Sequence, residues 1–345
     1  MLSFCLNKLA PTTKSTQSFN NKFGVPLSLF NVKKNDKFAV LEVGMDKAGE
    51  IDNLTKIIRP NLAVITNISY AHIKNFKSLT EIAKAKSEII NNIVKGGKII
   101  LNQDDDYFNF LKKIALKKDI QVISFSKKNS SSDVYIKKII SKKTNFKIFV
   151  NIKNLTKSFL IKKNLSPYLY NVLASVAIIS EFCDLKNIDE KLLYNFKLPF
   201  SRGDQTKIRL KNKIIYLTDE SYNSNPLSLK FAIENFNKQN KSNKYLILGD
   251  MLELGKFSKI LHKKMSKIIN KTSIKKVYVI GKHIKETFYA IDRKKRGRIL
   301  RNKNEIYQLI KNDLNNNDHL MIKASNSTGL NNIAANIKKG RIYAI

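Results

Sequence analysis

Short apolar runs alternate along the chain with stretches of helical periodicity. Runs rich in β-branched residues predict strands at 37–43, 62–68, 98–102, 120–126, 213–219, 244–250, 277–281 and 319–325. A helical pattern follows most of these runs, which is typical of parallel, doubly wound sheets. We therefore predict an α/β fold with two doubly wound domains, residues 1–199 and 200–345, joined near the Pro- and Gly-containing segment 198–207.

Two neighbouring segments have a different pattern. Residues 133–163 alternate between apolar and polar positions, which predicts an inserted meander of antiparallel strands. The apolar stretch 166–182 follows, and we predict a helix with Ser166 as N-cap and Pro167 at the first helical position.

The predicted helix 78–93 carries a lysine in its apolar stripe. Ser78 and Glu81 form a capping-box pattern at its start. At about 100° per residue, Lys86 falls among the leucine and isoleucine positions, whereas Lys84 points away. An uncompensated buried ammonium is costly. Lys86 therefore either reaches the surface or a carboxylate, or it is a desolvated and reactive amine.

Polar residues follow several of the predicted strands. Glu42 ends one strand, and Asn67 and His72 follow the next. In open α/β sheets, ligands bind outside the carboxyl ends of the strands, and a glutamate and a histidine there could bind a divalent cation. A loop histidine without a ligand is the alternative. The stretch "DESYNSNP" (219–226) crowds one strand exit with polar groups, and a plain polar turn with Asn225 as N-cap is its alternative reading.

Composition narrows the class of protein. With 345 residues, 43% hydrophobic and 26% charged, the chain is typical of a globular protein of about two domains. We find no apolar run of about 20 residues. The two cysteines, Cys5 and Cys183, form no metal or disulfide framework, which favours a reducing cytoplasm. The net charge of +37 comes from lysines spread along the whole chain. We therefore expect no nucleic-acid partner, no membrane span, a monomer, and a positive field that attracts acidic substrates.

Several motifs, taken in order, resemble the Mur ligase family, at the branch that adds D-alanyl-D-alanine. They are "FNNKFGVP" (19–26), "LEVGMDKAGEIDNL" (41–54), "ITNISYAHI" (65–73), "YNVLASVAI" (170–178), "FSRGDQT" (200–206), "DESYNSNP" (219–226), "LGDMLELG" (248–255) and "IKASNSTGL" (322–330). The resemblance covers essentially the whole chain. It implies a central domain of ATPase type and a Rossmann-like C-terminal domain.

The resemblance also implies a reaction. ATP would phosphorylate the terminal carboxylate of a UDP-N-acetylmuramoyl-tripeptide, and the amine of D-Ala-D-Ala would attack the acyl phosphate, with ATP and Mg²⁺ as cofactors. Carried over by position, the site residues are Glu42, His72 and a carbamylated Lys86 for magnesium; Asn171, Arg202 and Asp219 for the nucleotide; Asn20 and Asn21 for the muramoyl-peptide; and Tyr222, Asn223, Asn225 and Ser325 for the dipeptide. Lys86, His72 and Arg202 would act in catalysis.

The chain departs from the family pattern in one large respect. The phosphate loop G-x-x-x-x-G-K-[ST] is absent from the 345 residues. We therefore expect the chain to begin inside the helix that follows this loop, without the first strand and the uridine-nucleotide domain, and to be inactive alone. A non-catalytic remnant or binding protein that keeps the nucleotide or dipeptide pocket is the alternative.

Two smaller departures concern the ligand contacts. "SPYLYN" lacks the histidine and asparagine usual before the tyrosine, and Asn326 stands where an arginine is frequent. The adenine contact and the dipeptide contact at these positions are therefore expected to be weaker.

Overall fold

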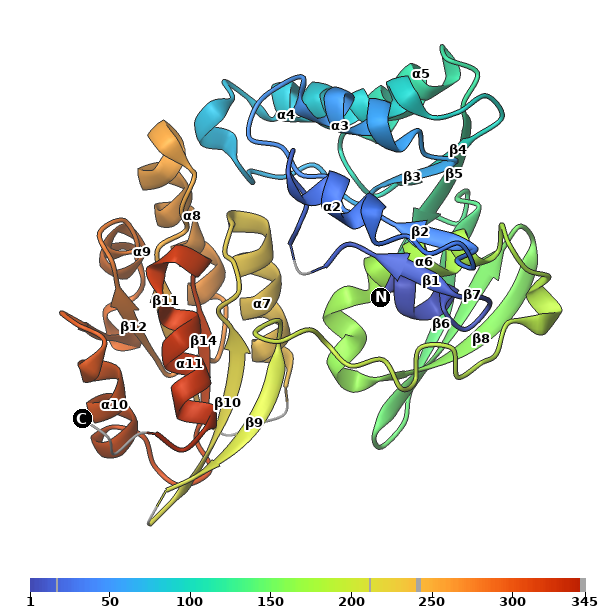
Figure 1. Cartoon of the computed structure of the whole chain (residues 1–345). Helices are drawn as coiled ribbons and strands as arrows, with labels where there is room; N and C mark the ends of the chain where they lie inside the picture. Colours follow the sequence, from blue (N-terminus) through green and yellow to red (C-terminus); the bar gives the residue numbers. More distant parts are fainter. Residues whose placement is uncertain (17, 211, 240–242, 342–345) are drawn as a thin grey trace. The chain divides into compact units, whose positions relative to one another are not determined.

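The computed structural model describes residues 1–16, 18–210, 212–239 and 243–341 (Figure 1). The chain forms two compact units. The first consists of residues 1–68 and 75–197, and the second of residues 69–74 and the chain from residue 198. Among the described residues, no helix has the length and apolar character required to cross a membrane. Cys5 and Cys183 are free thiols.

The first unit is built on a six-stranded sheet with the order β3-β4-β5-β6-β7-β8. Its strands are β3 (Leu62–Ile65), β4 (Lys98–Asn102), β5 (Gln121–Ser126), β6 (Val134–Ser141), β7 (Asn145–Ile152) and β8 (Leu155–Lys162). The strands from β3 to β6 pair in parallel, and β6, β7 and β8 pair antiparallel. The predicted antiparallel meander is thus confirmed. A separate parallel pair joins β1 (Thr12–Lys14) to β2 (Phe38–Val40), so the predicted strand 37–43 is shorter than expected.

Helices cover both faces of this sheet. They are α1 (Leu2–Leu6), α2 (Gly24–Phe30), α3 (Glu50–Ile58), α4 (Leu79–Ser87), α5 (Phe108–Leu116) and α6 (Leu169–Ile179). Figure 1 shows α5 and α6 on opposite sides of β4 and β5. Every residue of α6 from Val172 to Ile179 is buried, so this helix lies in the core. Because helices cover both faces of the sheet at β4, this strand is apolar at successive positions rather than at alternate ones.

The helix starts test two capping predictions. Ser78 is the N-cap of α4, and its Oγ accepts the Glu81 N–H at 3.3 Å. The Glu81 carboxylate accepts the N–H of Lys77, one residue before the cap, at 2.7 Å. The predicted cap at Ser166 is wrong, because residues Lys163–Tyr168 form a 3₁₀ turn and α6 begins at Leu169. Pro167 is accommodated there, since the fixed φ of proline lies within the 3₁₀ range.

The second unit has its own six-stranded sheet, with the order β13-β12-β11-β14-β10-β9. The strands are β9 (Asp204–Arg209), β10 (Ile214–Glu220), β11 (Lys244–Gly249), β12 (Lys276–Ile280), β13 (Arg296–Ile299) and β14 (His319–Lys323). Only β9 is antiparallel to its neighbour. The strands β9 and β13 were missed by the hydrophobic pattern because both are edge strands rich in charged residues.

The direction in which the chain crosses this sheet reverses once. The helices are α7 (Pro226–Lys238), α8 (Ser258–Asn270), α9 (Lys285–Ala290), α10 (Asn304–Asn312) and α11 (Leu330–Lys338). From β10 the chain moves through β11 and β12 to β13, and then returns to insert β14 between β10 and β11. Because crossovers are right-handed, α7, α8 and α9 cover one face, and α10 and α11 the other. The apolar side chains of α10 and α11 form one core with β10, β11 and β14.

The reversal defines the site of the second unit. Ligands of doubly wound sheets bind at the carboxyl ends of strands where the chain changes direction. β14 is parallel to both β10 and β11, so the residues that follow these three strands share one edge. These exits are residues 221–225, 250–255 and 324–329.

One glycine of this edge permits a test of its packing. Gly281 has φ +138°, and a Cβ there would lie 2.5 Å from the Asp250 carboxylate. We expect Gly281→Ala to lower the free energy of unfolding by about 2–4 kcal/mol, from backbone strain plus displacement of Asp250. Gly340 is the control, since it also has positive φ but no neighbour within 4 Å of its Cβ position. Gly340→Ala should cost about 1 kcal/mol in urea unfolding. Equal losses would contradict the crowding.

Candidate active site

In the first unit, two of the predicted site residues meet after β2. Asn20 Nδ2 donates to Glu42 Oε1 at 2.9 Å, and the Asn20 carbonyl accepts the Gly44 N–H at 2.7 Å. A Cβ on Gly44 would lie 2.9 Å from the Asn20 amide, so this approach requires glycine. Asn21 has a different role, because its Oδ1 accepts two backbone N–H groups at the start of α2.

Lys86 is oriented into the first unit, as its place in the apolar stripe predicts. Its Nζ donates to the Asn67 carbonyl at 3.0 Å, just beyond the end of β3, while Lys84 is exposed. Burial lowers the pKa of Lys86, and the charge of Asp105 partly opposes this. Burial in turn raises the pKa of Asp105, although the hydrogen bonds that it accepts from two backbone N–H groups act in the opposite direction. A lowered pKa makes the neutral and nucleophilic form of the Lys86 amine easier to reach.

The start of α6 supplies a second cluster in this unit. The Lys127 ammonium lies 3.9 Å from the ring centroid of Tyr170. Burial, followed by the neighbouring Asp104 carboxylate, raises the pKa of Tyr170. Asp104 also accepts the hydroxyl of Ser126 at 2.5 Å, which holds the cluster at the end of β5. The next residue on α6, Asn171, is exposed, so the predicted nucleotide contact is sterically available to it.

His72 belongs to the second unit, whereas Glu42 and Lys86 belong to the first. Its Nδ1 lies 2.7 Å from Glu253 Oε2, and the Lys74 N–H donates to the Glu253 carbonyl at 2.9 Å. His72 has φ +60°, a left-handed conformation that is uncommon for a residue other than glycine. The segment 69–74 is thus held on the loop after β11. The predicted magnesium set stays a prediction.

Asp219 is used inside the second unit. It is fully buried, and its carboxylate accepts the N–H and hydroxyl of Ser221 at 3.0 and 2.5 Å and the Ser201 hydroxyl at 2.9 Å. The Lys338 ammonium bridges Asp219 and Asp204. Both oxygens of Asp219 are therefore bound. The predicted ribose contact, which stays a prediction, would have to replace one of these bonds.

Arg202 and Tyr222, predicted for different ligands, lie together. The Arg202 guanidinium carbon is 4.1 Å from the Tyr222 ring centroid, a cation–π distance. The Tyr222 N–H donates to the Ser201 carbonyl at 3.1 Å, which fixes the two loops against each other. Ser201 and Gly203 have φ +57° and +84°, so the chain turns sharply on both sides of Arg202.

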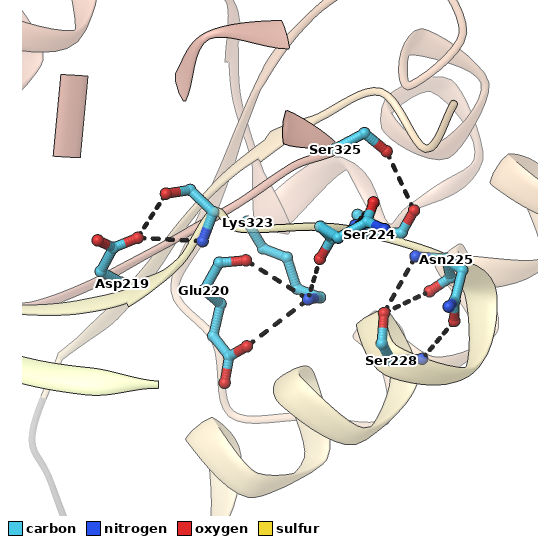
Figure 2. A network of polar contacts seen from close by, with 9 residues as sticks. Asp219, Glu220, Ser224, Asn225, Ser228, Lys323 and Ser325 are labelled. Carbon is cyan, nitrogen blue, oxygen red and sulfur yellow. Dashed lines mark hydrogen bonds and ion pairs between the residues drawn. The ribbon is translucent and has the colours of Figure 1, made fainter. Parts of the chain in front are cut away.

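A buried lysine organises the exit of β10 (Figure 2). Lys323, the last residue of β14, is 2% exposed, and its Nζ donates to the carbonyls of Asn223 at 2.9 Å and Glu220 at 3.5 Å. The Glu220 carboxylate lies 3.6 Å from the same ammonium. Burial lowers the pKa of Lys323 and raises the pKa of Glu220.

Ser325 connects the same loop to the exit of β11. Its hydroxyl accepts the Leu252 N–H at 2.9 Å and donates to the Ser224 carbonyl at 3.1 Å. Asn225 caps α7, since its Oδ1 accepts the Ser228 N–H at 2.9 Å and its N–H donates to the Ser228 hydroxyl at 3.0 Å. Figure 2 shows the bond from Ser325 to Ser224 and those between Asn225 and Ser228. The capping alternative for Asn225 is therefore confirmed. Because the cap uses its Oδ1, the predicted substrate contact, which stays a prediction, would have to come from its amide nitrogen.

The loop after β11 is held by buried polar groups. His262 is fully buried, its Nε2 accepts the Met251 N–H at 3.0 Å, and its Nδ1 lies 2.8 Å from the Ser258 carbonyl. Burial lowers the pKa of His262, which favours the neutral ring that this pair of contacts requires. Asp250 accepts three consecutive backbone N–H groups at residues 282–284.

A cavity of about 280 Å³ opens at this edge of the second unit. Its lining combines apolar side chains with a lysine, a carboxylate and two hydroxyl groups: Asp250, Leu252, Ile280, Gly281, Lys303, Ser327, Thr328 and Leu330. The Lys303 ammonium lies against Gly329, at the start of α11. A small zwitterion with methyl groups matches this lining in polarity.

A larger hollow of about 370 Å³ lies in the first unit, between Asn7 and Asp36. It lies at the amino ends of β1 and β2, since Pro11 and Asp36 come before these strands. Ligands of parallel sheets bind at the opposite ends of the strands. The exits therefore carry the candidate site.

Two models of known protein domains match the chain. The Mur ligase middle domain matches residues 1–179, and the Mur ligase glutamate ligase domain matches residues 207–326. The chain therefore belongs to the Mur ligase family.

Two curated relatives carry the same name. The UDP-N-acetylmuramoyl-tripeptide–D-alanyl-D-alanine ligase of Buchnera aphidicola subsp. Baizongia pistaciae is 34% identical, over 98% of this chain and 72% of its own. The ligase of the same name from Rickettsia prowazekii is 29% identical, over 92% of this chain and 70% of its own.

Solved structures give the same result. MurF from Acinetobacter baumannii has a TM-score of 0.85 at 25% identity and covers 98% of this chain, which covers 73% of it. MurF from Thermotoga maritima, solved in complex with ADP, has a TM-score of 0.83 at 21% identity over 99% of this chain and 76% of its own, which is evidence of fold.

Sequence reasoning missed Glu253, His262, Lys303 and Lys323 as site residues. Lys323 could have been found, because it interrupts the apolar run 319–325 at a central-strand position. His262 lies on the buried face of an amphipathic helix, which is a weaker signal. Glu253 lies in the motif "LGDMLELG" (248–255), to which no role was assigned, and Lys303 carries no local signal, since it is an exposed charged residue in a loop.

The buried histidine predicts a pH dependence of stability. Because the pKa of His262 is lowered on folding, the unfolded chain binds its proton first as the pH falls below 6.5. The free energy of unfolding should therefore fall through this interval, by at most about 1.4 kcal/mol per pH unit. His262→Gln, which cannot titrate, should lack this part of the decline in urea unfolding between about pH 7.5 and pH 5. His283→Gln is the control and should retain it, so the same decline in both variants would contradict the assignment.

Proposed function

We propose that this chain serves the ATP-dependent joining of D-Ala-D-Ala to UDP-N-acetylmuramoyl-tripeptide through an acyl phosphate, in peptidoglycan precursor synthesis in the cytoplasm. Relatives that carry this name match 92% and 98% of the chain. The single structural observation that carries the proposal is the buried amine of Lys86, bound to a carbonyl at a strand exit. Such an amine has no need to be there for folding alone, since an apolar residue would fill the stripe at lower cost.

Lys86 fits the proposed carbamate. Its neutral amine would add to the carbon of CO₂, form an N–C bond and release one proton to solvent, which gives an anionic oxygen ligand. Burial favours the neutral amine that this reaction requires. Glu42, exposed after β2, would supply a second oxygen ligand, and His72 a nitrogen ligand once its bond to Glu253 is exchanged. Magnesium, when bound, supplies positive charge against the charge that accumulates during phosphoryl and acyl transfer.

The remaining roles follow from the described contacts. Arg202, held over the ring of Tyr222, offers a delocalised cation that suits phosphate oxygens. Asn171 would contact the nucleotide base side from α6, and Asp219 would keep the loops of the second unit in place for the ribose. Asn20 is proposed to hold the muramoyl-peptide, and its bond to Glu42 would orient both side chains. Asn21 would support it from the turn that starts α2.

The dipeptide is proposed to bind at the edge of the second unit. The cavity there pairs Lys303 with apolar walls, which suits a carboxylate next to alanine methyl groups. Tyr222, Asn223, Asn225 and Ser325 belong to the loops that border this edge.

The reaction is testable with mass spectrometry of the pentapeptide product. Because the 345 residues contain no G-x-x-x-x-G-K-[ST] motif, we expect no turnover from this polypeptide alone. Placing the segment that precedes the match in the 34%-identical relative before Met1 should give product that depends on ATP and D-Ala-D-Ala. In that chimera, Lys86→Met should lower turnover by more than about 100-fold. Lys84→Met, on the exposed side of the same helix, should leave it unchanged.

Three results would count against the proposal. Turnover by the 345 residues alone would refute the expected need for the loop. A folded chimera that binds ADP and D-Ala-D-Ala without making product would favour the alternative, a binding protein that keeps these pockets. A Lys86→Met chimera as active as its Lys84→Met counterpart would exclude the carbamate.

Lys303 yields a separate prediction for dipeptide recognition. Lys303→Gln should weaken D-Ala-D-Ala binding about 10-fold in calorimetry, the effect of losing a hydrogen bond to a charged group. The C-terminal amide of the dipeptide, which lacks the carboxylate, should bind the unaltered chain equally weakly. The variant and the amide combined should show no further loss, since both remove the same interaction. Lys259→Gln, an exposed lysine outside the cavity, is the control, and additive losses would place the carboxylate elsewhere.

A further inference from the structure

Among the residues that the structure describes, the second unit buries three lysines, and one of them differs from the others in its partners. Lys244 and Lys295 donate to backbone carbonyls, Lys244 to Asn237 and Lys295 to Thr272 and Ile274. The Asn237 carbonyl lies in the last turn of α7, and those of Thr272 and Ile274 lie in the connection from α8 to β12. Lys323 donates instead to the exit loop of β10 and faces the Glu220 carboxylate.

The position of Lys323 follows from the topology. β14 is the strand inserted between β10 and β11, and Lys323 is paired in register with Glu220 of β10 and Leu248 of β11. Its side chain therefore starts at the point where the chain changes direction in the sheet. From there the ammonium reaches the Asn223 carbonyl at 2.9 Å and the Glu220 carbonyl at 3.5 Å (Figure 2).

The backbone N–H groups of Ser221, Tyr222 and Ser224 in this loop donate to acceptors outside β14. The N–H of Ser221 donates to Asp219, that of Tyr222 to the Ser201 carbonyl, and that of Ser224 to the side chain of its neighbour Asn223. Three carbonyls here are held from the end of β14 and the residues after it: those of Glu220 and Asn223 accept Lys323, and that of Ser224 accepts Ser325. Lys323 thus fixes the side of the loop that local turn contacts leave open.

The energetics make this ammonium difficult to replace. Without it, two carbonyls and the Glu220 carboxylate would remain in an environment where Lys323 is 2% exposed. An unpaired buried charge is strongly unfavourable, and the loop can relieve it only by opening toward water. Burial lowers the pKa of Lys323 and raises the pKa of Glu220, as expected for a pair whose side chains are 2% and 16% exposed.

We propose that Lys323 is a positioning residue: its ammonium holds the loop 221–225 in the conformation that receives the small zwitterionic dipeptide. This assignment rests on the proposed function for the identity of the ligand. Lys323 itself touches no substrate, and its effect passes through the carbonyls of Glu220 and Asn223. Tyr222 and Asn223, whose side chains are proposed to meet the dipeptide, lie in the stretch that it holds.

The test compares two buried lysines of one unit. Lys323→Met and Lys295→Met each remove an ammonium of similar burial, but only the first faces the loop. In the unliganded 345-residue chain, Lys323→Met should speed hydrogen exchange at the amides of Tyr222 and Ser224 by at least about 10-fold. It should also raise the Kd for D-Ala-D-Ala by at least about 10-fold in calorimetry. Lys295→Met should leave both values unchanged.

A double variant separates positioning from charge neutralisation. Lys323→Met with Glu220→Gln removes the unpaired carboxylate, so it should regain stability in urea unfolding and also serves if the single variant folds poorly. If Lys323 positions the loop, exchange stays fast and dipeptide binding stays weak in this double variant. Recovery of both values to those of the unaltered chain would overturn the proposal, as would equal effects of Lys323→Met and Lys295→Met.

The exchange readout keeps this proposal independent of the function. An unaltered chain that binds neither D-Ala-D-Ala nor ADP would contradict the proposed function, while the amide exchange at Tyr222 and Ser224 still decides whether Lys323 orders the loop. Fast exchange in Lys323→Met without any change in dipeptide affinity would overturn the positioning role in binding.

Discussion

A lysine amine that is removed from water requires carbonyl or carboxylate partners, and this requirement shapes the strand exits in both units. In the first unit Lys86 reaches the Asn67 carbonyl beyond β3, and in the second Lys323 reaches the loop that follows β10. Each amine lies at a carboxyl end of a parallel strand, where backbone carbonyls are free of the sheet ladder. The two differ in what burial achieves. Lys86 donates to the Asn67 carbonyl and gains nucleophilic character, whereas Lys323 donates to two carbonyls, faces a carboxylate and gains rigidity.

Much of the polar character of these exits serves the fold itself. Asp219 is enclosed by two serines and a lysine, Asn225 caps α7, and His262 holds the loop after β11. The side chains in these contacts are not available to bind a ligand, but they hold the loops in one arrangement before a ligand arrives. Preorganisation of this kind reduces the entropy lost on binding. The residues left for recognition are those with exposed groups, such as Arg202 over Tyr222 and Lys303 at the cavity.

Periodicity predicted the central strands and the antiparallel meander well, because these segments are buried and their apolar spacing is regular. It also placed Lys86 on the buried side of α4, which the structure confirms. It failed at β1, β9 and β13, strands with polar or charged residues whose pairing depends on neighbours rather than on their own pattern. The helix start at Ser166 was wrong because a 3₁₀ turn and an α-helix share the same capping signals.

The amino-acid sequence by itself determined the α/β class, the buried amine of Lys86 and the motifs that the Mur ligase family shares, since these depend on residues close together in the chain. Only the tertiary structure decided which polar residues meet across distant segments. His72 contacts Glu253, which lies 181 residues later in the chain, and Lys323 donates to the carbonyl of Asn223, which lies 100 residues earlier. The first contact depends on segment 69–74 lying against the loop after β11, and the second on the insertion of β14 between β10 and β11. Strand order is set by the packing of the whole unit, and no local pattern contains it.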